Sequence, residues 1–243
     1  MTFRPWVVDI IKETISMIND PQQKIDRLRG ENPFISSREL AYNIILDSIL
    51  SGELDSDKKL TQSILADELD MSRTPVKEAL SKLEKDGFIE KAETASLYTV
   101  KKFDIGDFID FSELRLAIEP DAAFRAARYI NENDSKRLKS CLEVQEKLAA
   151  AKDMAGLIFN HTQFHKLIVE ASQNKYYIDI YNIYENKSLF FNRGFMSEST
   201  ISYNLLKHRL IAEKIINHRE IEAREEMKVH LSFYAKSASR RIL

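Results

Sequence analysis

The chain has 243 residues, 44% of them hydrophobic and 30% charged, which is enough for one large or two ordinary packed cores and excludes a disordered protein. A formal net charge of −2 excludes a broadly basic surface, so any affinity for DNA must come from cations placed locally. Cys141 is the single cysteine, which excludes an intramolecular disulfide and a CxxC site. Since no apolar run approaches about 18 residues and the start lacks a signal-peptide pattern, we expect a soluble cytoplasmic protein that makes no membrane contact.

Residues 1–33 are predicted to form an N-terminal helical extension. One apolar stripe at helical spacing indicates a helix, and its members are Val7, Ile10, Ile11, Ile15 and Ile18. Asp20-Pro21 is predicted to end this helix, and Arg27 to Pro33 is predicted to be a linker. Such an extension serves either as an arm packed on its own subunit or as an arm exchanged between the subunits of a dimer.

The next stretch, residues 34–102, contains the pattern of three short helices. The apolar positions of the first, with the glycine that ends it, are Leu40, Ile44, Ile45, Ile49, Leu50 and Gly52. Thr61 can cap a second helix over residues 62–69. Ser72 can cap a third with its hydroxyl, and Gly87 ends that helix.

The third helix has an apolar back and a small cationic front. Its back holds Val76, Ala79, Leu80 and Leu83, and its front holds Arg73, Thr74 and Lys77. An ordinary surface helix would show the same two faces, but the tight connection Asp70-Met71 favours a helix-turn-helix, whose second helix enters the DNA major groove. Two short strands expected at 88–90 and 97–100 complete a winged helix-turn-helix.

These residues resemble the DNA-binding domain of GntR-type bacterial regulators over roughly 36–102. The motifs that carry the resemblance are Leu60-Thr61-Gln62, Leu65-Ala66, Met71 to Leu80, Leu83-Glu84 and Asp86 to Ile89. The family often has an acidic residue where Gln62 stands and an Arg where Ser63 stands, and its wing usually carries the glycines that residues 93–96 lack. The resemblance implies double-stranded DNA as a partner, contacted by Ser72, Arg73, Thr74, Lys77, Thr61 and Ser63.

Residues 103–243 read as helices throughout. No proline follows Pro120, and Gly156 and Gly194 are the only glycines after it. Breaks are expected at residues 131–134, 152–153, 173–174, 192–194 and 217–218. The chain as a whole is therefore expected to be mainly α, with a winged helix-turn-helix joined to an all-helical bundle of about six helices.

The five histidines of the chain all lie in this helical region. His161 and His165 are spaced i, i+4, which places both rings on one helix face about 6 Å apart, a spacing that suits two ligands of one metal ion. On one helix, His208 and His230 would lie about 33 Å apart. A hairpin at 217–218 would bring them back to the same height on adjacent helices. Four histidines could then converge on one ion, although helical histidines are more often surface or core residues, and His218 is expected to lie in the turn.

Residues 105–238 resemble, more loosely, the FCD effector domain of the FadR branch of GntR-type regulators. The resemblance rests on Leu114-Arg115, Ile118-Glu119, Ala122-Ala123, Phe164-His165, Ala171-Ser172, Asn174, His208-Arg209 and His230-Leu231. Many such domains bind a divalent metal through an Asp, a His four residues later and two further His. His165, His208 and His230 match these histidines, and His161 stands at the Asp position. An all-imidazole site favours Zn²⁺, Ni²⁺ or Cu²⁺ over Mg²⁺ or Mn²⁺, so zinc or nickel is the expected cofactor.

The same resemblance implies a small carboxylate effector bound beside the metal and an arginine. Arg115 stands at the family's arginine position, and its alternative role is a salt bridge to Glu119 at i+4. Asn192 and Arg193 are expected at the rim of the effector cavity.

These expectations describe a transcriptional regulator, most simply a repressor, that binds a palindromic operator as a homodimer and responds to a small carboxylate. One alternative is a winged-helix DNA-binding protein whose helical domain only dimerises. A remote one is a metal-dependent hydrolase. An enzyme is not expected, because the chain has no HExxH, GxSxG or P-loop motif and four protein ligands tend to close a zinc site.

Overall fold

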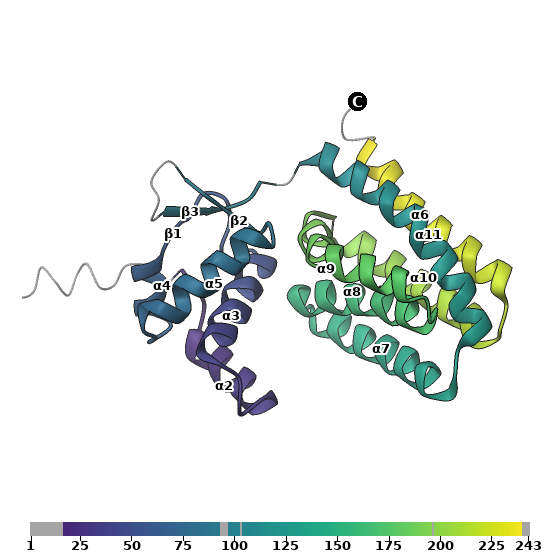
Figure 1. The fold of residues 1–243 in the computed structure, drawn as a ribbon, viewed down its shortest axis with the longest axis horizontal. Helices are drawn as coiled ribbons and strands as arrows, with labels where there is room; N and C mark the ends of the chain where they lie inside the picture. Colours follow the sequence, from purple (N-terminus) through teal and green to yellow (C-terminus); the bar gives the residue numbers. More distant parts are fainter. Residues whose placement is uncertain (1–16, 93–96, 103, 196, 240–243) are drawn as a thin grey trace, which may run out of the picture. The chain divides into compact units, whose positions relative to one another are not determined.

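The computed structural model describes residues 17–92, 97–102, 104–195 and 197–239, and in them it shows ten helices and one three-stranded sheet (Figure 1). The chain divides into two compact units, Met1–Lys101 and Lys102–Leu243. The expected fold class, mainly α with a winged helix-turn-helix followed by a helical bundle, is confirmed. Among the described residues, no helix is both long and apolar enough to cross a membrane.

The first described helix, α2 (Pro21–Glu31), corrects two expectations for the N-terminal extension. Asp20-Pro21 begins this helix instead of ending one, because the Asp20 side chain accepts the N–H of Gln23 and proline is well suited to a first turn. The linker expected from Arg27 to Pro33 is wrong over most of its length, since the helix continues through Glu31.

The extension is docked on the next helix and on the turn that follows it. Lys24 Nζ lies 3.1 Å from a carboxylate oxygen of Asp47 and 2.9 Å from one of Glu53. Ile18 is fully buried, whereas the rest of the predicted apolar stripe, Val7 to Ile15, lies outside the described residues. In the described part, the extension packs against its own unit.

The winged helix-turn-helix contains the predicted helices and hairpin and one strand that the sequence pattern missed. Its elements are α3 (Ser37–Ser51), β1 (Lys59–Thr61), α4 (Gln62–Glu68), α5 (Arg73–Lys85), β2 (Ile89–Lys91) and β3 (Leu97–Val100). The sheet order is β1-β3-β2 with antiparallel pairing, so β3 is the central strand. The missed strand β1 has three residues and leads directly into α4, which leaves no room for an alternating pattern. Residues 93–96, the wing loop without glycine, lie outside the described residues.

Apolar side chains from these helices form one core that holds the back of α5. The fully buried members of this core include Ile44, Ile45, Ile49, Leu65, Val76, Ala79, Leu83 and Phe88. Burying each of the large ones contributes about 1.5–3 kcal/mol relative to exposure. The core therefore fixes the orientation of α5, and Gly87, with a φ of 82°, allows the chain to leave its C-terminal end.

The second unit consists of the six expected helices. They are α6 (Ile105–Tyr129), α7 (Glu132–Ala151), α8 (Met154–Ala171), α9 (Lys175–Phe195), α10 (Glu198–Ile216) and α11 (Glu220–Ser239). Four of the five predicted breaks separate these helices. The break predicted at 192–194 is wrong, because Asn192 is buried and donates its amide to Thr162 Oγ1 at 3.2 Å, while Gly194 lies in the last turn of α9.

α10 and α11 form the predicted hairpin, and α11 runs alongside α6 (Figure 1). His218 lies in the hairpin turn, as expected, with a left-handed φ of 56°. Small side chains line the contact between α6 and its neighbours, and five of them are fully buried: Ala122, Ala123, Ala126, Ala127 and Ala223. Because alanines let helix backbones approach closely, α6, α8, α10 and α11 can surround a narrow interior.

Candidate nucleic-acid interface and metal centre

The N-terminal end of α5 presents the predicted DNA-contacting side chains to solvent. Ser72, Arg73, Thr74 and Lys77 are all exposed. The opposite face, led by Val76 and Leu80, is buried in the core. A helix with an anchored back and an exposed, cationic first turn has the geometry that major-groove recognition requires.

The hydroxyl groups around this helix start have different roles. Ser72 is the N-cap residue of α5 but makes no side-chain capping bond, contrary to the prediction. Thr61 caps α4 as predicted by accepting the N–H of Ile64 at 3.3 Å, and its hydroxyl lies 3.4 Å from that of Ser63. Gln62 Nε2 donates to the Arg73 carbonyl at 2.7 Å, which ties the start of α4 to the start of α5.

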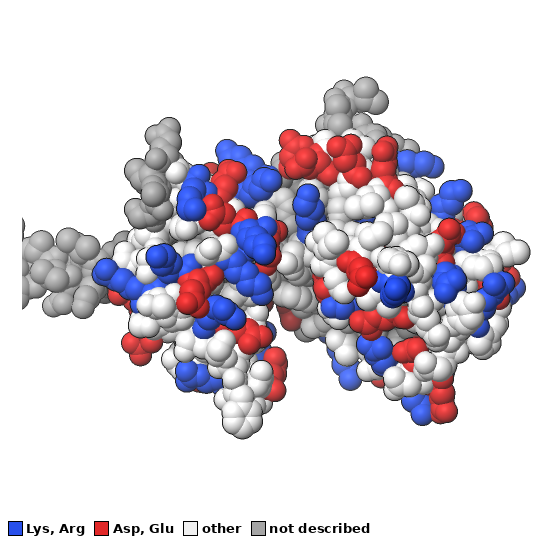
Figure 2. Space-filling model, viewed as in Figure 1, with Lys and Arg blue, Asp and Glu red and all other residues white. Residues whose placement is uncertain are grey.

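Cations and carboxylates are mixed over this unit. Residues 34–103 carry a net charge of −3, and Figure 2 shows Lys and Arg side chains interspersed with Asp and Glu on the visible face of the N-terminal unit. Lys82 is held over the Tyr42 ring at 4.0 Å, and Lys91 pairs with Glu84 at 3.1 Å. Bulk attraction for DNA is therefore weak, so affinity for DNA depends on where individual cations are placed.

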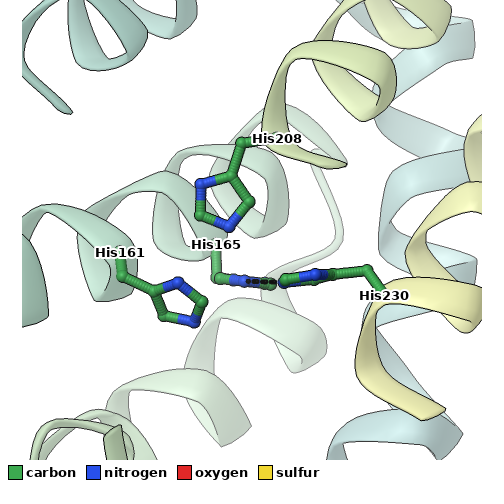
Figure 3. A group of neighbouring side chains, drawn as sticks. All are labelled: His161, His165, His208 and His230. Atoms are coloured by element: carbon green, nitrogen blue, oxygen red, sulfur yellow. Dashed lines mark hydrogen bonds between the residues drawn. The ribbon is translucent and has the colours of Figure 1, made fainter. Parts of the chain in front are cut away.

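Four histidines meet in the interior of the helical unit, on the three helices that the sequence indicated. His161 and His165 come from α8, His208 from α10 and His230 from α11 (Figure 3). One nitrogen from each ring lies within 4.8 Å of the others, and the four side chains are buried. The His165 and His230 Nε2 atoms are 3.2 Å apart.

Two polar side chains outside the cluster hold its rings. His165 Nδ1 lies 2.6 Å from Glu119 Oε2, and His208 Nδ1 lies 3.0 Å from Gln145 Oε1. Since both partners are acceptors, we assign the protons to Nδ1, which leaves the Nε2 lone pairs of both rings directed into the cluster. The His208 ring also stacks on Phe164, with centroids 4.0 Å apart.

The cluster is neutral in the folded protein. Burial, with a smaller effect of the Arg115 charge, lowers the pKa of His208 to about 3. Burial also lowers the pKa values of His161, His165 and His230 well below 6.5, and neighbouring positive charges lower them further. Neutral imidazoles are the form that binds a metal ion.

The donor set fits a transition-metal ion. Imidazole nitrogens bind Zn²⁺ at about 2.0–2.1 Å, so two ligands of a tetrahedral ion lie about 3.3 Å apart, close to the separation of the His165 and His230 Nε2 atoms. Both ring nitrogens of His161, with Nε2 of His208 and Nδ1 of His230, are buried without a hydrogen-bond partner among the described residues. Buried polar atoms are rarely left unpaired, and an ion at this site would give a partner to one nitrogen of His161 and to Nε2 of His208.

Glu119 links the cluster to the predicted effector arginine. It is fully buried, and Arg115 donates to it through Nε at 2.7 Å and through a terminal nitrogen at 3.2 Å. The Tyr184 hydroxyl donates to the same carboxylate at 3.0 Å. Burial opposes the charge of Arg115, but Glu119 outweighs it and raises the pKa of the guanidinium. The salt bridge considered as the alternative role of Arg115 is thus present.

The other two predicted effector residues occupy different positions on α9. Asn192 is buried and contacts Thr162, the residue that follows His161 on α8. Arg193 is half-buried in the last turns of the helix. The structure joins Arg115 to the cluster through Glu119, and it joins Asn192 to the helix that carries His161.

The sequence reasoning missed Gln145 and the part that Glu119 plays at His165. Gln145 follows Leu138 and Cys141 at helical spacing, and all three are buried, so a polar residue on an apolar stripe was the available signal. Glu119 was considered only as a partner of Arg115. Its contact with His165 joins residues 46 positions apart, which helical spacing alone does not reveal.

Comparison with known proteins identifies both regions of the chain. Residues 110–233 match the FCD domain, and residues 38–97 match the bacterial regulatory proteins of the gntR family. The HTH-type transcriptional regulator YdhC of Bacillus subtilis is 24% identical over 196 residues, which are 79% of this chain and 86% of that protein. The gluconate operon transcriptional repressor of Bacillus licheniformis is 27% identical over 135 residues, 55% of this chain and 54% of that repressor.

Solved structures show the same fold. The chain is similar to McbR/YncC of Escherichia coli, with a TM-score of 0.69, 18% identity and coverage of 86% of this chain and all of that one. It is also similar to a GntR regulator of Rhodococcus sp. RHA1, with a TM-score of 0.70, 16% identity and coverage of 85% and 99%. With its helix-turn-helix and FCD regions both matched, the chain belongs to the GntR family of bacterial transcriptional regulators that carry an FCD domain, the FadR branch.

Proposed function

We propose that this GntR-family regulator is a repressor whose affinity for a palindromic operator is controlled by a small carboxylate bound near a metal ion in the helical unit. The observation that carries the proposal is the contact chain from the imidazole cluster through Glu119 to Arg115. The metal centre and the arginine are then parts of one polar network. The protein acts as a cytoplasmic homodimer, since one recognition helix contacts too little DNA and a twofold dimer reads a palindrome.

The metal is Zn²⁺ or Ni²⁺, held by His165, His208 and His230, with His161 as fourth ligand. Four neutral imidazoles bring no ligand charge and favour these ions over Mg²⁺ or Mn²⁺. A carboxylate oxygen would need a coordination position beyond the four imidazoles, which six-coordinate Ni²⁺ would supply and four-coordinate Zn²⁺ would supply only by expanding its coordination or releasing His161. Glu119 and Gln145 would hold two of the rings in the binding tautomer.

The effector is a small organic or sugar acid. Glu119 already occupies Arg115, so an effector carboxylate pairs with this arginine only by replacing Glu119 as its partner. One relative is named for a gluconate operon, which makes gluconate a suitable first acid to test. An acid that binds the DNA-competent and incompetent states unequally shifts DNA affinity by the ratio of its two affinities.

Metal content and thermal unfolding of the full-length protein test the metal centre. After treatment with a chelator, Zn²⁺ or Ni²⁺ alone should bind in a 1:1 ratio per chain and raise the Tm, because binding is coupled to the folded state. His208→Ala should bind less metal, whereas His218→Asn, at the hairpin turn, should bind as wild type does. Absence of stoichiometric metal and of any acid-induced thermal shift would favour the alternative in which the helical unit only dimerises.

DNA titrations test the two remaining parts. Arg73→Ala should weaken binding to an operator selected from a random-sequence pool by about 1–3 kcal/mol. Arg115→Ala would leave the Glu119 carboxylate buried and unpaired, so the neutral pair Arg115→Met/Glu119→Gln is the better effector variant. In this variant the acid should no longer release DNA, and release as efficient as in wild type would contradict the effector site.

A further inference from the structure

A polar groove separates α2 from the turn that precedes the recognition helix. Its volume is about 260 Å³. Gln22, Ile25 and Arg29 line one wall and lie on one face of α2, whereas Met71, Ser72 and Pro75 belong to the opposite wall. The groove therefore runs directly beside the first turn of α5, whose exposed residues are the candidate contacts to DNA.

α2 is an addition to the part of the chain that matches the gntR family, which begins at residue 38. Its packing is fixed, because Ile25 is buried and Lys24 pairs with Glu53 and Asp47. An element fixed in this way can present a side chain to DNA at little cost in conformational entropy.

Arg29 is the cation of α2 that remains available to a ligand. Lys24 is engaged by two carboxylates, and the Arg27 guanidinium lies 3.8 Å from Asp47. Arg29 is exposed, and within the described ranges no hydrogen bond or ion pair engages its side chain. Asp70 also lines the groove, on the other wall, so the groove carries one charge of each sign.

We propose that α2 extends the DNA-binding surface, with Arg29 contacting a backbone phosphate next to the groove entered by α5 and Gln22 donating to the same strand. The ligand is the sugar–phosphate backbone, because a guanidinium and an amide pair with phosphate oxygens regardless of base sequence. Asp70 repels the same phosphate and limits non-specific affinity. The inference rests on DNA binding through α5 and adds a second, sequence-independent contact.

The test measures binding of full-length variants to two 30-base-pair duplexes, one random in sequence and one selected by the wild-type protein, over a range of salt concentrations. Arg29→Ala should weaken binding to both duplexes by about threefold per protomer and reduce the slope of log K against log salt by about one per protomer. Arg27→Ala, on the same helix but paired with Asp47, should leave affinity and slope almost unchanged.

Asp70→Asn is the matched variant with the opposite sign. Its backbone φ of 49° is left-handed and suits asparagine as well as aspartate, so the change removes charge without backbone strain. It should strengthen binding to both duplexes. Arg29→Ala with the wild-type affinity and slope, or Asp70→Asn with no gain, would overturn the α2 contact. Arg73→Ala is measured in the same titrations. If it loses the preference for the operator, α5 reads DNA, and a failure of the α2 contact is then distinguished from a failure of DNA binding through α5.

Discussion

At the scale of single residues, the candidate metal centre depends on Glu119. This carboxylate accepts from Arg115, Tyr184 and His165, so it joins three helices through one buried charge. A buried ion pair costs desolvation energy, and its removal from one side is usually far more harmful than its replacement by a neutral pair. Glu119 thus holds the His165 ring as well as neutralising Arg115.

Glu119→Gln should weaken metal binding by about 10- to 100-fold, because a neutral amide orients His165 less strongly and makes its ring a poorer donor. It should also destabilise the metal-free fold by about 3–5 kcal/mol, because Arg115 loses its counter-charge. Arg115→Met/Glu119→Gln separates the effects: its unfolding temperature should recover while its metal affinity stays low. Wild-type metal affinity in both variants, measured by Zn²⁺ titration, would contradict a role for Glu119 at His165.

The lowered pKa values of the buried histidines predict an acid-labile fold. The pKa of His208 falls from 6.5 to about 3 on folding, so between these values the unfolded chain binds more protons than the folded one. Stability is therefore fully present above about pH 6.5 and is lost as the pH falls, by about 1.4 kcal/mol per pH unit for each such histidine. Urea unfolding of the chelator-treated protein at pH 7, 6 and 5 measures this slope.

His208→Gln should remove close to one proton from that slope. Equal slopes in His208→Gln and wild type would mean that His208 is not held neutral by burial.

At the scale of elements, strong periodic patterns predicted the helices, and local exceptions caused the errors. The six helices of the second unit, 18 to 25 residues long, were predicted because no proline follows Pro120 and short polar breaks divide the stretch. Asp20-Pro21 was misread because a proline that ends one helix and a proline that starts the next look alike in sequence. Asn192 and Gly194 resemble a break, and only the tertiary bond to Thr162 shows that α9 continues.

The small-residue face of α6 makes an element-scale prediction. Ala126 is fully buried in the core that α6 shares with α8, α10 and α11. Ala126→Leu should destabilise the protein by about 1–3 kcal/mol, because the added methyl groups have no space and must push helices apart. Ala150→Leu, on the exposed side of α7, provides the matched control and should change stability by less than about 0.5 kcal/mol. Comparable unfolding temperatures for the two variants would contradict tight packing at α6.

At the scale of the whole molecule, the sequence predicted both units and the convergence of four histidines, since a hairpin at 217–218 follows from the composition of that turn. It could not predict how each imidazole is held, because Glu119 and Gln145 approach from helices distant in sequence. The homodimer is also a prediction for the whole molecule, and it depends on the exposed face of one helix.

A homodimer needs an apolar surface, and α9 offers one. Tyr176, Ile180 and Ile183 follow at i, i+4 and i+7, and they are 64%, 38% and 82% exposed. Such a stripe is unusual on a monomer and suits a twofold contact in which the same face meets itself.

We expect the wild-type protein to have the mass of a dimer in sedimentation. Ile183→Glu should shift it to the mass of a monomer, because the substitution places two like charges against each other. Val229→Glu, at a 50% exposed position on α11, is the control and should remain dimeric. Because a palindrome is read by two recognition helices at once, Ile183→Glu should also lose most operator affinity while its binding to random DNA, per protomer, changes little. A monomeric wild type, or a dimer that survives Ile183→Glu and dissociates in Val229→Glu, would show that the α9 stripe has another partner.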